Sequence, residues 1–217
     1  ETIKGFHNIR HRFVQWDEAL KRDAAGRKKE LSEEIGWIES RRGDMLGFWS
    51  KVEEGTIPTR VTHNDTKINN ILFDRQGEVL CAIDLDTVMA STSLNDFGDA
   101  IRSYANTGDE DDRDLSRVGL SLEMFRAYTE GYLSQRAKQL TDSEIDHLAF
   151  SARYITFEQV LRFLMDYIDG DTYYKVKYPG HNLVRTHAQY RLLQSMEEHY
   201  GEMCRIVRET VDKYRKA

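Results

Sequence analysis

Hydrophobic positions near the start of the chain recur at the spacing of a helix. Phe6, Ile9, Phe13, Trp16 and Leu20 follow one another at alternating steps of three and four residues, which places them on one face of an amphipathic helix. Such a face must be buried, so the pattern predicts a helix packed on a core.

Two shorter apolar sets follow this helix. The apolar positions between Leu31 and Ile38 predict a second helix, and those between Leu46 and Val52 predict a third. Pro58 cannot continue a helix, because its ring removes the backbone N–H and clashes with the preceding turn. The chain should therefore change conformation at about residue 58.

The pattern after residue 60 is that of extended structure. Two short apolar runs, 71–73 and 79–83, are separated by the turn-like sequence Asp74-Arg75-Gln76-Gly77. This arrangement predicts a β-hairpin. Cys81 lies inside the second run and Cys204 inside a helical pattern, and we expect both to be reduced, buried thiols.

The helical period returns for the rest of the chain. It predicts a helix over 122–132, a long helix that starts at the capping box of Thr141 and Glu144 and extends to Tyr167, and a last helix from about Leu183 to Val207. The acidic run 109–114 is expected to be an exposed loop. The predicted fold class is mostly α with a small β-hairpin.

The overall charge excludes several classes of partner. The 217 residues carry a formal net charge of -6, which provides no basic field for nucleic acid or an anionic membrane. We see no apolar run long enough to span a membrane and no leader-like segment, so a soluble, cytoplasmic protein is expected.

The candidate catalytic and metal-binding residues lie on either side of the predicted hairpin. The segment 63–70 precedes its first strand and contains Asp65 and Asn70, and Asp84 follows its second strand. Phosphoryl transfer needs one carboxylate to orient or deprotonate the acceptor hydroxyl, and oxygen ligands to hold Mg²⁺. A hairpin brings its two flanking loops together, so these three side chains are expected to share one site.

The order of residues in these two loops resembles a known catalytic motif. H-x-D-x-K-x-x-N over 63–70, followed by I-D-L-D over 83–86, resembles the catalytic loop and metal-binding aspartate of the protein-kinase-like superfamily. The sequence of the two loops resembles that of the aminoglycoside phosphotransferase and choline kinase family, and most closely that of its N-acetylhexosamine 1-kinase members. The likeness continues through 95–102, 162–167, 170–171 and 181–183 and covers essentially the whole chain.

The resemblance implies an ATP-dependent small-molecule kinase that uses Mg²⁺. Carried over by position, it implies that Asp65 is the catalytic base, that Asn70 and Asp84 hold Mg²⁺, and that His63 supports the loop. By analogy Lys67 touches the transferred phosphoryl group. Asp86 replaces the glycine of the usual D-F-G triplet, and it is either a further metal ligand or a loop cap.

The resemblance also implies a helical C-terminal lobe, with the N-terminal β lobe absent from this sequence. We expect one lobe over 1–217, with leading helices in 1–58, the catalytic loop, hairpin and metal-binding loop in 59–90, and an acceptor-binding helical subdomain in 91–217. A chain without the β lobe should be inactive alone.

The acceptor is expected to bind in the second half of the chain. A cluster around Pro179-Gly180 combines the aromatic, amide and cationic groups that stack on and hydrogen-bond a sugar, and it comprises Tyr173, Tyr174, His181, Asn182, Arg185 and Gln189. Ordinary packing is the alternative for each of these residues. Arg162 and Glu158, four residues apart, are expected to pair with each other.

Several alternatives remain open from the sequence. A choline, ethanolamine, homoserine or aminoglycoside kinase of the same fold is the first, and a non-catalytic binding module is the second. The mixed charge of the expected pocket favours a neutral sugar over a polycationic aminoglycoside. Asp96 and Asp99 are equally compatible with a catalytic role and with capping a helix that begins near Phe97.

Overall fold

The computed structural model describes residues 3–216, which form eight α-helices and four short strands. The helices are α1 (Ile9–Arg22), α2 (Ser32–Glu39), α3 (Arg42–Glu53), α4 (Ser93–Tyr104), α5 (Leu122–Arg136), α6 (Asp142–Ile168), α7 (His181–Glu198) and α8 (Tyr200–Arg215). The strands are β1 (Arg60–Thr62), β2 (Ile71–Phe73), β3 (Val79–Ala82) and β4 (Met89–Ser91). The protein is mostly helical, as the hydrophobic pattern predicts.

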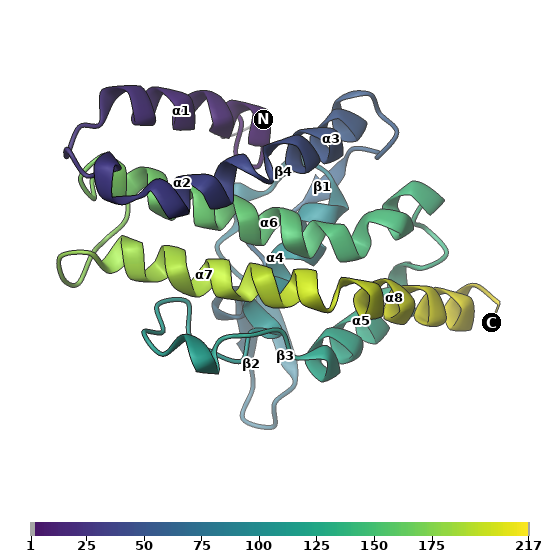
Figure 1. Ribbon diagram of the computed structural model, residues 1–217. Coiled ribbons are helices and arrows are strands. Elements are labelled where there is room, and N and C mark those ends of the chain that lie inside the picture. The colour runs from purple at the N-terminus through teal and green to yellow at the C-terminus, as the bar shows by residue number, and fades with distance from the viewer. Residues whose placement is uncertain (1–2, 217) are drawn as a thin grey trace.

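Helix α6 forms the centre of the core. It begins at the predicted capping box, in which the Thr141 side chain accepts from the Glu144 backbone N–H and the Glu144 side chain accepts from the Thr141 N–H. Helices α4 and α7 pack along it, and α1 and α8 contact it as well. Figure 1 shows α6 and α7 running side by side across the middle of the molecule. The core therefore lies between α6 and its neighbours.

A close contact between α4 and α6 depends on Gly98 of α4. A Cβ atom placed at this position would lie 2.3 Å from the carbonyl oxygen of Ser151 in α6. No side chain larger than hydrogen fits at that distance. Gly98 therefore sets how closely α4, which carries groups of the candidate site, approaches α6.

The predicted hairpin is confirmed as the antiparallel pair β2–β3. Its turn is closed by the Asp74 carboxylate, which accepts from the N–H groups of Gln76 and Glu78, and by Gly77 with a φ of +86°. The hairpin projects from the body (Figure 1). Cys81 is exposed on β3, so the expectation of a buried thiol there was wrong; Cys204 is half-buried.

Three features of the fold differ from the predictions. A second antiparallel pair, β1–β4, joins Arg60–Thr62 to Met89–Ser91. The last helical region is two helices that meet at His199, whose ring and backbone N–H both approach the Ser195 carbonyl at the end of α7. Helix α4 begins at Ser93 and is capped by the Thr92 hydroxyl, so neither Asp96 nor Asp99 is its cap.

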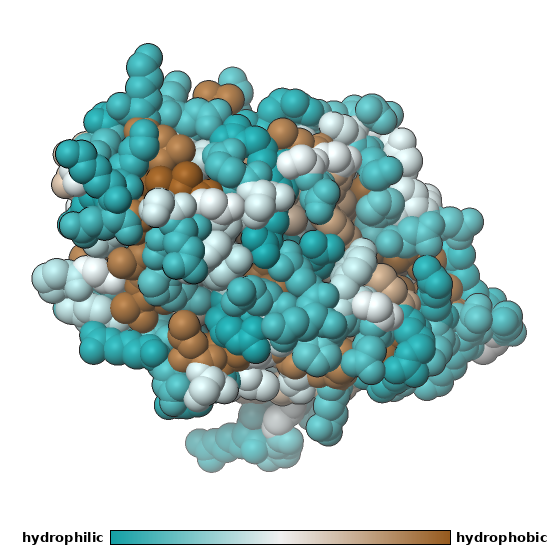
Figure 2. All heavy atoms as spheres, in the orientation of Figure 1, coloured by the Kyte–Doolittle hydropathy of each residue, from teal (hydrophilic) through white to brown (hydrophobic). Residues whose placement is uncertain are grey.

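The surface is largely hydrophilic on the face shown in Figure 2, where small apolar groups lie between charged side chains. Within residues 3–216, no helix is long and apolar enough to cross a bilayer.

Candidate active site

The segment with the predicted base is anchored to α4. The Asp96 carboxylate accepts hydrogen bonds from the backbone N–H groups of His63 (3.0 Å) and Asn64 (2.7 Å), the two residues before Asp65. Burial raises the pKa of Asp96, and these two N–H donors act in the opposite direction. Asn64 has a φ of 65°, a conformation that few residues other than glycine adopt. Asp96 therefore holds this strained turn in place.

Side-chain hydrogen bonds also tie the loop to the segment after β3. The Asp65 N–H donates to Nδ1 of His63 (3.3 Å), so Nε2 of the same ring is the donor to the Ile83 carbonyl (2.9 Å). The Thr87 hydroxyl donates to the His63 carbonyl, at 2.7 Å, and the Asn64 side chain donates to the Thr87 carbonyl, at 3.0 Å. The two loops that flank the hairpin are thus fixed to each other, as its geometry predicts.

The Asp65 carboxylate is held on one of its two oxygens. Oδ2 accepts from Nζ of Lys67 (2.7 Å) and from Nδ2 of Asn70 (2.8 Å). Asn70 also donates to the Asp65 backbone carbonyl, at 2.9 Å. Among the described residues, Oδ1 receives no hydrogen bond and so remains available to a hydroxyl group. The motif therefore brings Asp65, Lys67 and Asn70 into direct contact.

The segment with the other expected metal ligands is joined to this group through the backbone. The Ile83 N–H donates to the Asn70 carbonyl (2.9 Å), which places Asp84 next to Asn70. Asp84 has a φ of 61°, and within residues 3–216 no side chain pairs with its carboxylate or with that of Asp86. The described residues contain no preassembled group of three or more histidine, cysteine or acidic side chains. Asn70, Asp84 and Asp86 are hard oxygen donors that fit Mg²⁺ if phosphate oxygens and water complete its shell.

A cavity of about 410 Å³ opens in front of Asp65. It is lined by residues from the N-terminal segment, the catalytic loop, α4, the loop after α4, α6, α7 and the loop before α7. They are Phe6, Asp65, Lys67, Asn69, Arg102, Glu110, Gln159, Arg162, Phe163, Tyr173, Tyr174 and Arg185. Its volume is in the range of small-molecule sites.

Two of the predicted acceptor residues are presented to this cavity by a structured loop. The Asp166 carboxylate accepts from the backbone N–H groups of Thr172, Tyr173 and Tyr174, at 2.8 to 3.0 Å. Tyr173 is 72% exposed, whereas Tyr174 packs on Phe163 and accepts a hydrogen bond from Gln159. Burial raises the pKa of Tyr174, so its hydroxyl stays protonated.

The other predicted acceptor residues divide between the cavity and the core. Arg185 lines the cavity, with its guanidinium 5.3 Å from the Phe163 ring centroid. His181 and Asn182 are fully buried and do not line it: His181 bonds to Asp111 (2.8 Å), and Asn182 donates to Asp166 and Asp171. These two residues shape the loops around the cavity.

The acidic segment 109–114 is more ordered than an exposed connector. Glu110 pairs with Arg102, and Asp111 pairs with His181 and Lys177. Hydrogen bonds from His181 and Lys177 hold the pKa of Asp111 below its ordinary value. Asp112 is buried, so the expectation of a fully solvated loop was wrong there. The ion pairs fasten this loop along one side of the cavity.

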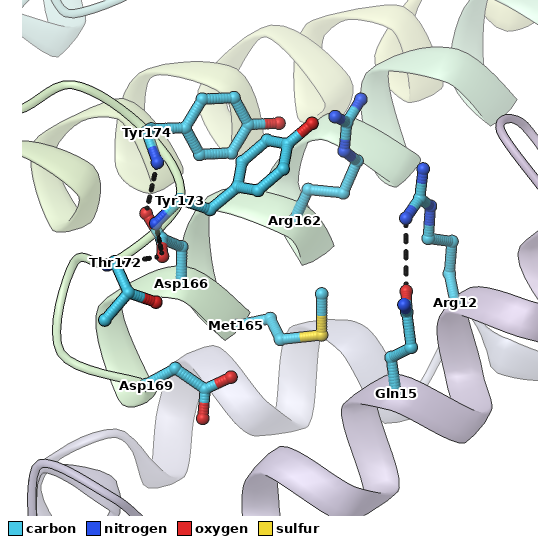
Figure 3. A pocket seen from close by; sticks show the side chains of 9 residues that line it. All are labelled: Arg12, Gln15, Arg162, Met165, Asp166, Asp169, Thr172, Tyr173 and Tyr174. Carbon is cyan, nitrogen blue, oxygen red and sulfur yellow. Dashed lines mark hydrogen bonds between the residues drawn. The ribbon is translucent and has the colours of Figure 1, made fainter. Parts of the chain in front are cut away.

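Arg162 does not form the predicted pair with Glu158. Glu158 binds His7 and Arg12 instead, and the Arg162 guanidinium lies 5.5 to 5.9 Å from the ring centroids of Phe6, Tyr173 and Tyr174. A second hollow of about 250 Å³ shares Arg162 and both tyrosines with the first. Figure 3 shows Arg12 and Gln15 of α1 facing Arg162 across it.

Several cavity residues were not recognised in the sequence. The sequence predicts that Phe6 belongs to a helix packed on the core, that Arg162 pairs with Glu158 and that Glu110 lies in an exposed loop. Their neighbours come from distant parts of the chain, and nothing in the local sequence of Phe6 or Glu110 marks them. For Arg162, and for Asp96 of the catalytic-loop anchor, the signal is that segments 162–167 and 95–102 resemble the family.

A sequence model of the phosphotransferase enzyme family, APH, matches residues 1–133, and the chain belongs to that family. The matched region includes both loops of the site and ends within α5. The protein is thus assigned to a family of kinase-type phosphotransferases. The segment with Tyr173, Tyr174 and Arg185 lies beyond the match.

Proposed function

We propose that the protein transfers the γ-phosphoryl group of ATP to a hydroxyl of a small molecule, with a sugar such as an N-acetylhexosamine as the acceptor. The observation that carries this proposal is the carboxylate of Asp65. One of its oxygens is fixed by Lys67 and Asn70, and the other is available in front of a cavity of about 410 Å³. Family membership supports the reaction class.

Each residue of the loop then has a role in the reaction. Asp65 orients the acceptor hydroxyl and accepts its proton. Lys67 offsets negative charge on the transferred phosphoryl group. Asn70 and Asp84, with Asp86 in addition, hold Mg²⁺, which neutralises charge on the phosphate oxygens when it is bound. Tyr173, Tyr174 and Arg185 contact the acceptor, while His181 and Asn182 support the loops that carry them.

The charge of the cavity supports a sugar over a cationic acceptor. Arg162 and Arg185 line it, and within residues 3–216 neither has a carboxylate within 4.0 Å. They would repel an aminoglycoside. Choline needs free aromatic faces, and the Arg162 guanidinium already lies near the rings of Tyr173 and Tyr174. A neutral, hydroxyl-rich ring suits this mixture of tyrosine, amide and guanidinium groups.

Nucleotide binding should also need a β lobe outside this chain. Apolar side chains on and after the hairpin are exposed, among them Leu72, Leu80 and Leu85, and they provide a surface on which such a lobe could pack. We expect the 217-residue chain to bind Mg-ATP weakly or not at all, as measured by calorimetry. A tight complex with this chain alone would contradict the requirement for a second lobe.

The acceptor can be identified with the full-length protein, ATP, Mg²⁺ and a panel of hexosamines, hexoses, choline, homoserine and aminoglycosides. We expect transfer to a hexosamine, with little transfer to choline or aminoglycosides. Replacing Asp84 with alanine should weaken metal-nucleotide binding, so that a higher Mg²⁺ concentration is needed for half-maximal activity. Transfer only to a cationic acceptor would contradict the sugar proposal, and no transfer to any acceptor would favour the non-catalytic alternative.

A further inference from the structure

The segment before α1 is joined to the catalytic loop through a buried histidine. The ring of His7 lies between two acceptors: Nδ1 is 2.7 Å from Oε2 of Glu158, and Nε2 is 2.9 Å from the Asn64 carbonyl oxygen. His7 and Glu158 are both buried. The Asn64 carbonyl belongs to the peptide group that links Asn64 to Asp65, so this contact acts next to the proposed base.

Two acceptors on one imidazole require two ring protons. A neutral imidazole has a single N–H, and its other nitrogen would turn a lone pair towards one of these oxygens. A carbonyl cannot donate. Burial alone would raise the pKa of Glu158, but the Arg12 guanidinium, whose Nε donates to Oε1 of Glu158 at 3.2 Å, lowers the pKa of that carboxyl group and keeps it ionised. The observed contacts are therefore those of an imidazolium.

The charged groups around His7 come from several elements. Helix α6 contributes Glu158 and Tyr154, and the Tyr154 hydroxyl donates to the His7 carbonyl. Helix α1 contributes Arg12, which donates to Glu158. Burial opposes the charge of His7, but Glu158, the Asn64 carbonyl and the more distant Asp99 raise its pKa above the ordinary value. Asp96 is a further acidic group near His7. Two cations oppose these carboxylates: Arg102 forms an ion pair with Asp99, and the charge of Arg162 lowers the pKa of Glu158.

We propose that His7 is a positioning residue: as an imidazolium clamped between Glu158 and the Asn64 carbonyl, it fixes the peptide group that precedes Asp65. Loss of the ring proton leaves His7 with one donor. The bond to the carboxylate is the stronger of the two and persists, so the bond to Asn64 is lost. The strained turn at Asn64 then keeps its bonds to Asp96 and Thr87 but loses the one at the Asn64 carbonyl. The catalytic consequence of this clamp rests on the proposed function, whereas the clamp itself does not.

The sign of the pH dependence follows from the raised pKa. The stabilisation by His7 is fully present below about pH 6.5, the ordinary pKa of histidine, and is lost as the pH rises through the pKa of the folded protein. The catalytic loop should therefore loosen on the alkaline side.

The protonation state can be tested in the 217-residue chain by ¹⁵N NMR of the histidine rings across pH. We expect both nitrogens of His7 to be protonated at about pH 7, with deprotonation above the ordinary pKa. A neutral His7 ring at that pH would overturn the proposal. The half-buried His147 of α6, whose ring bonds to a carbonyl of its own helix, is the reference in the same spectra.

Hydrogen exchange tests whether the clamp orders the loop. In His7→Gln, the amides of residues 62–67 should exchange about tenfold faster, as expected for the loss of one charge-assisted hydrogen bond, while those of α8 stay unchanged. His147→Gln should change neither. Glu158→Gln provides a second route, since it removes the carboxylate and should lower the pKa of His7. Unchanged exchange in 62–67 in both His7→Gln and Glu158→Gln would overturn the clamp.

A kinetic measurement separates positioning from stability. In the full-length protein, kcat should fall by about tenfold as His7 deprotonates while KM for the acceptor stays constant, and His7→Gln should lack this alkaline limb. Equal pH profiles for the wild type and His7→Gln would overturn the positioning role. If no acceptor is phosphorylated at all, the proposed function fails, and the ring titration and hydrogen exchange still decide whether His7 clamps the loop.

Discussion

The helical body and the segment 60–91 are stabilised in different ways. In the body, α4, α6 and α7 bury apolar side chains; Leu164 of α6 is 0% exposed. In 60–91, apolar side chains such as Leu80, 63% exposed, face outwards, and the loops are held by hydrogen bonds that His63 and Asn64 donate and that the Asp96 carboxylate accepts. The body supplies stability, and it anchors a strained polar segment that carries the candidate chemistry.

The largest loss of stability is expected from the close contact of α4 with α6 at Gly98. Gly98→Ala places a Cβ against the Ser151 carbonyl, so α4 and α6 must move apart, and we expect the free energy of unfolding to fall by about 3 kcal/mol or more. Chemical denaturation of the 217-residue chain measures this loss. Gly47→Ala in α3 is the control, because a Cβ there meets nothing within 4 Å. Equal stabilities of the two variants would contradict the packing argument.

The next effect concerns the link between the two regions. Glu144 of α6 accepts two hydrogen bonds from Arg60 of β1, at 2.6 and 2.7 Å, and one from Ser93. Glu144→Gln should reduce the free energy of unfolding by about 2–3 kcal/mol at neutral pH, because the Arg60 guanidinium loses the buried carboxylate with which it pairs. Denaturation with urea measures the change, and Glu18→Gln, on the exposed face of α1, is the control.

Acid should abolish the difference in the free energy of unfolding between the wild type and Glu144→Gln. Burial alone would raise the pKa of Glu144, but Arg60, the Thr141 N–H and Ser93 lower it to about 2. A lowered carboxyl pKa means that the stabilisation is present above the ordinary value of 4.5 and is lost as the pH falls towards about 2. A difference between wild type and Glu144→Gln that persists unchanged in acid would show that the pair is not its origin.

The smallest effect is expected on the hairpin. Leu80→Ala should change the free energy of unfolding of this chain by less than about 0.5 kcal/mol, since most of the side chain is already in water. The same truncation at Leu164 is the reference and should cost about 2–5 kcal/mol. A comparable loss at both positions would mean that the hairpin belongs to the core.

The sequence predicts the parts of the fold that depend on local patterns. The stripe from Phe6 to Leu20 and the capping box at Thr141 locate α1 and α6, and the turn at Gly77 locates the hairpin, but Phe6 itself lies before the start of α1. The break at His199 was missed, because no proline or glycine precedes it. The β1–β4 pair was missed as well, since three-residue strands carry no readable period.

In the candidate site, too, the sequence predicts only the contacts between residues that are close along the chain. Asp65, Lys67 and Asn70 are close in sequence, so the motif alone predicts that they meet, and they do. The environment of Arg162 depends on Phe6, which comes from the far end of the chain. Contacts of that kind follow from the packing of α1 on α6, which no local pattern encodes. The catalytic and binding roles of these residues remain predictions.

Replacing Asp65, the proposed catalytic base, with asparagine in a protein that includes the proposed β lobe is the most direct test of the proposal. Asn keeps the shape but cannot accept the hydroxyl proton, so kcat should fall by roughly 10² to 10⁴ while nucleotide affinity stays nearly unchanged. Asp146→Asn, on the exposed face of α6, should be fully active. Full activity of Asp65→Asn would contradict the account.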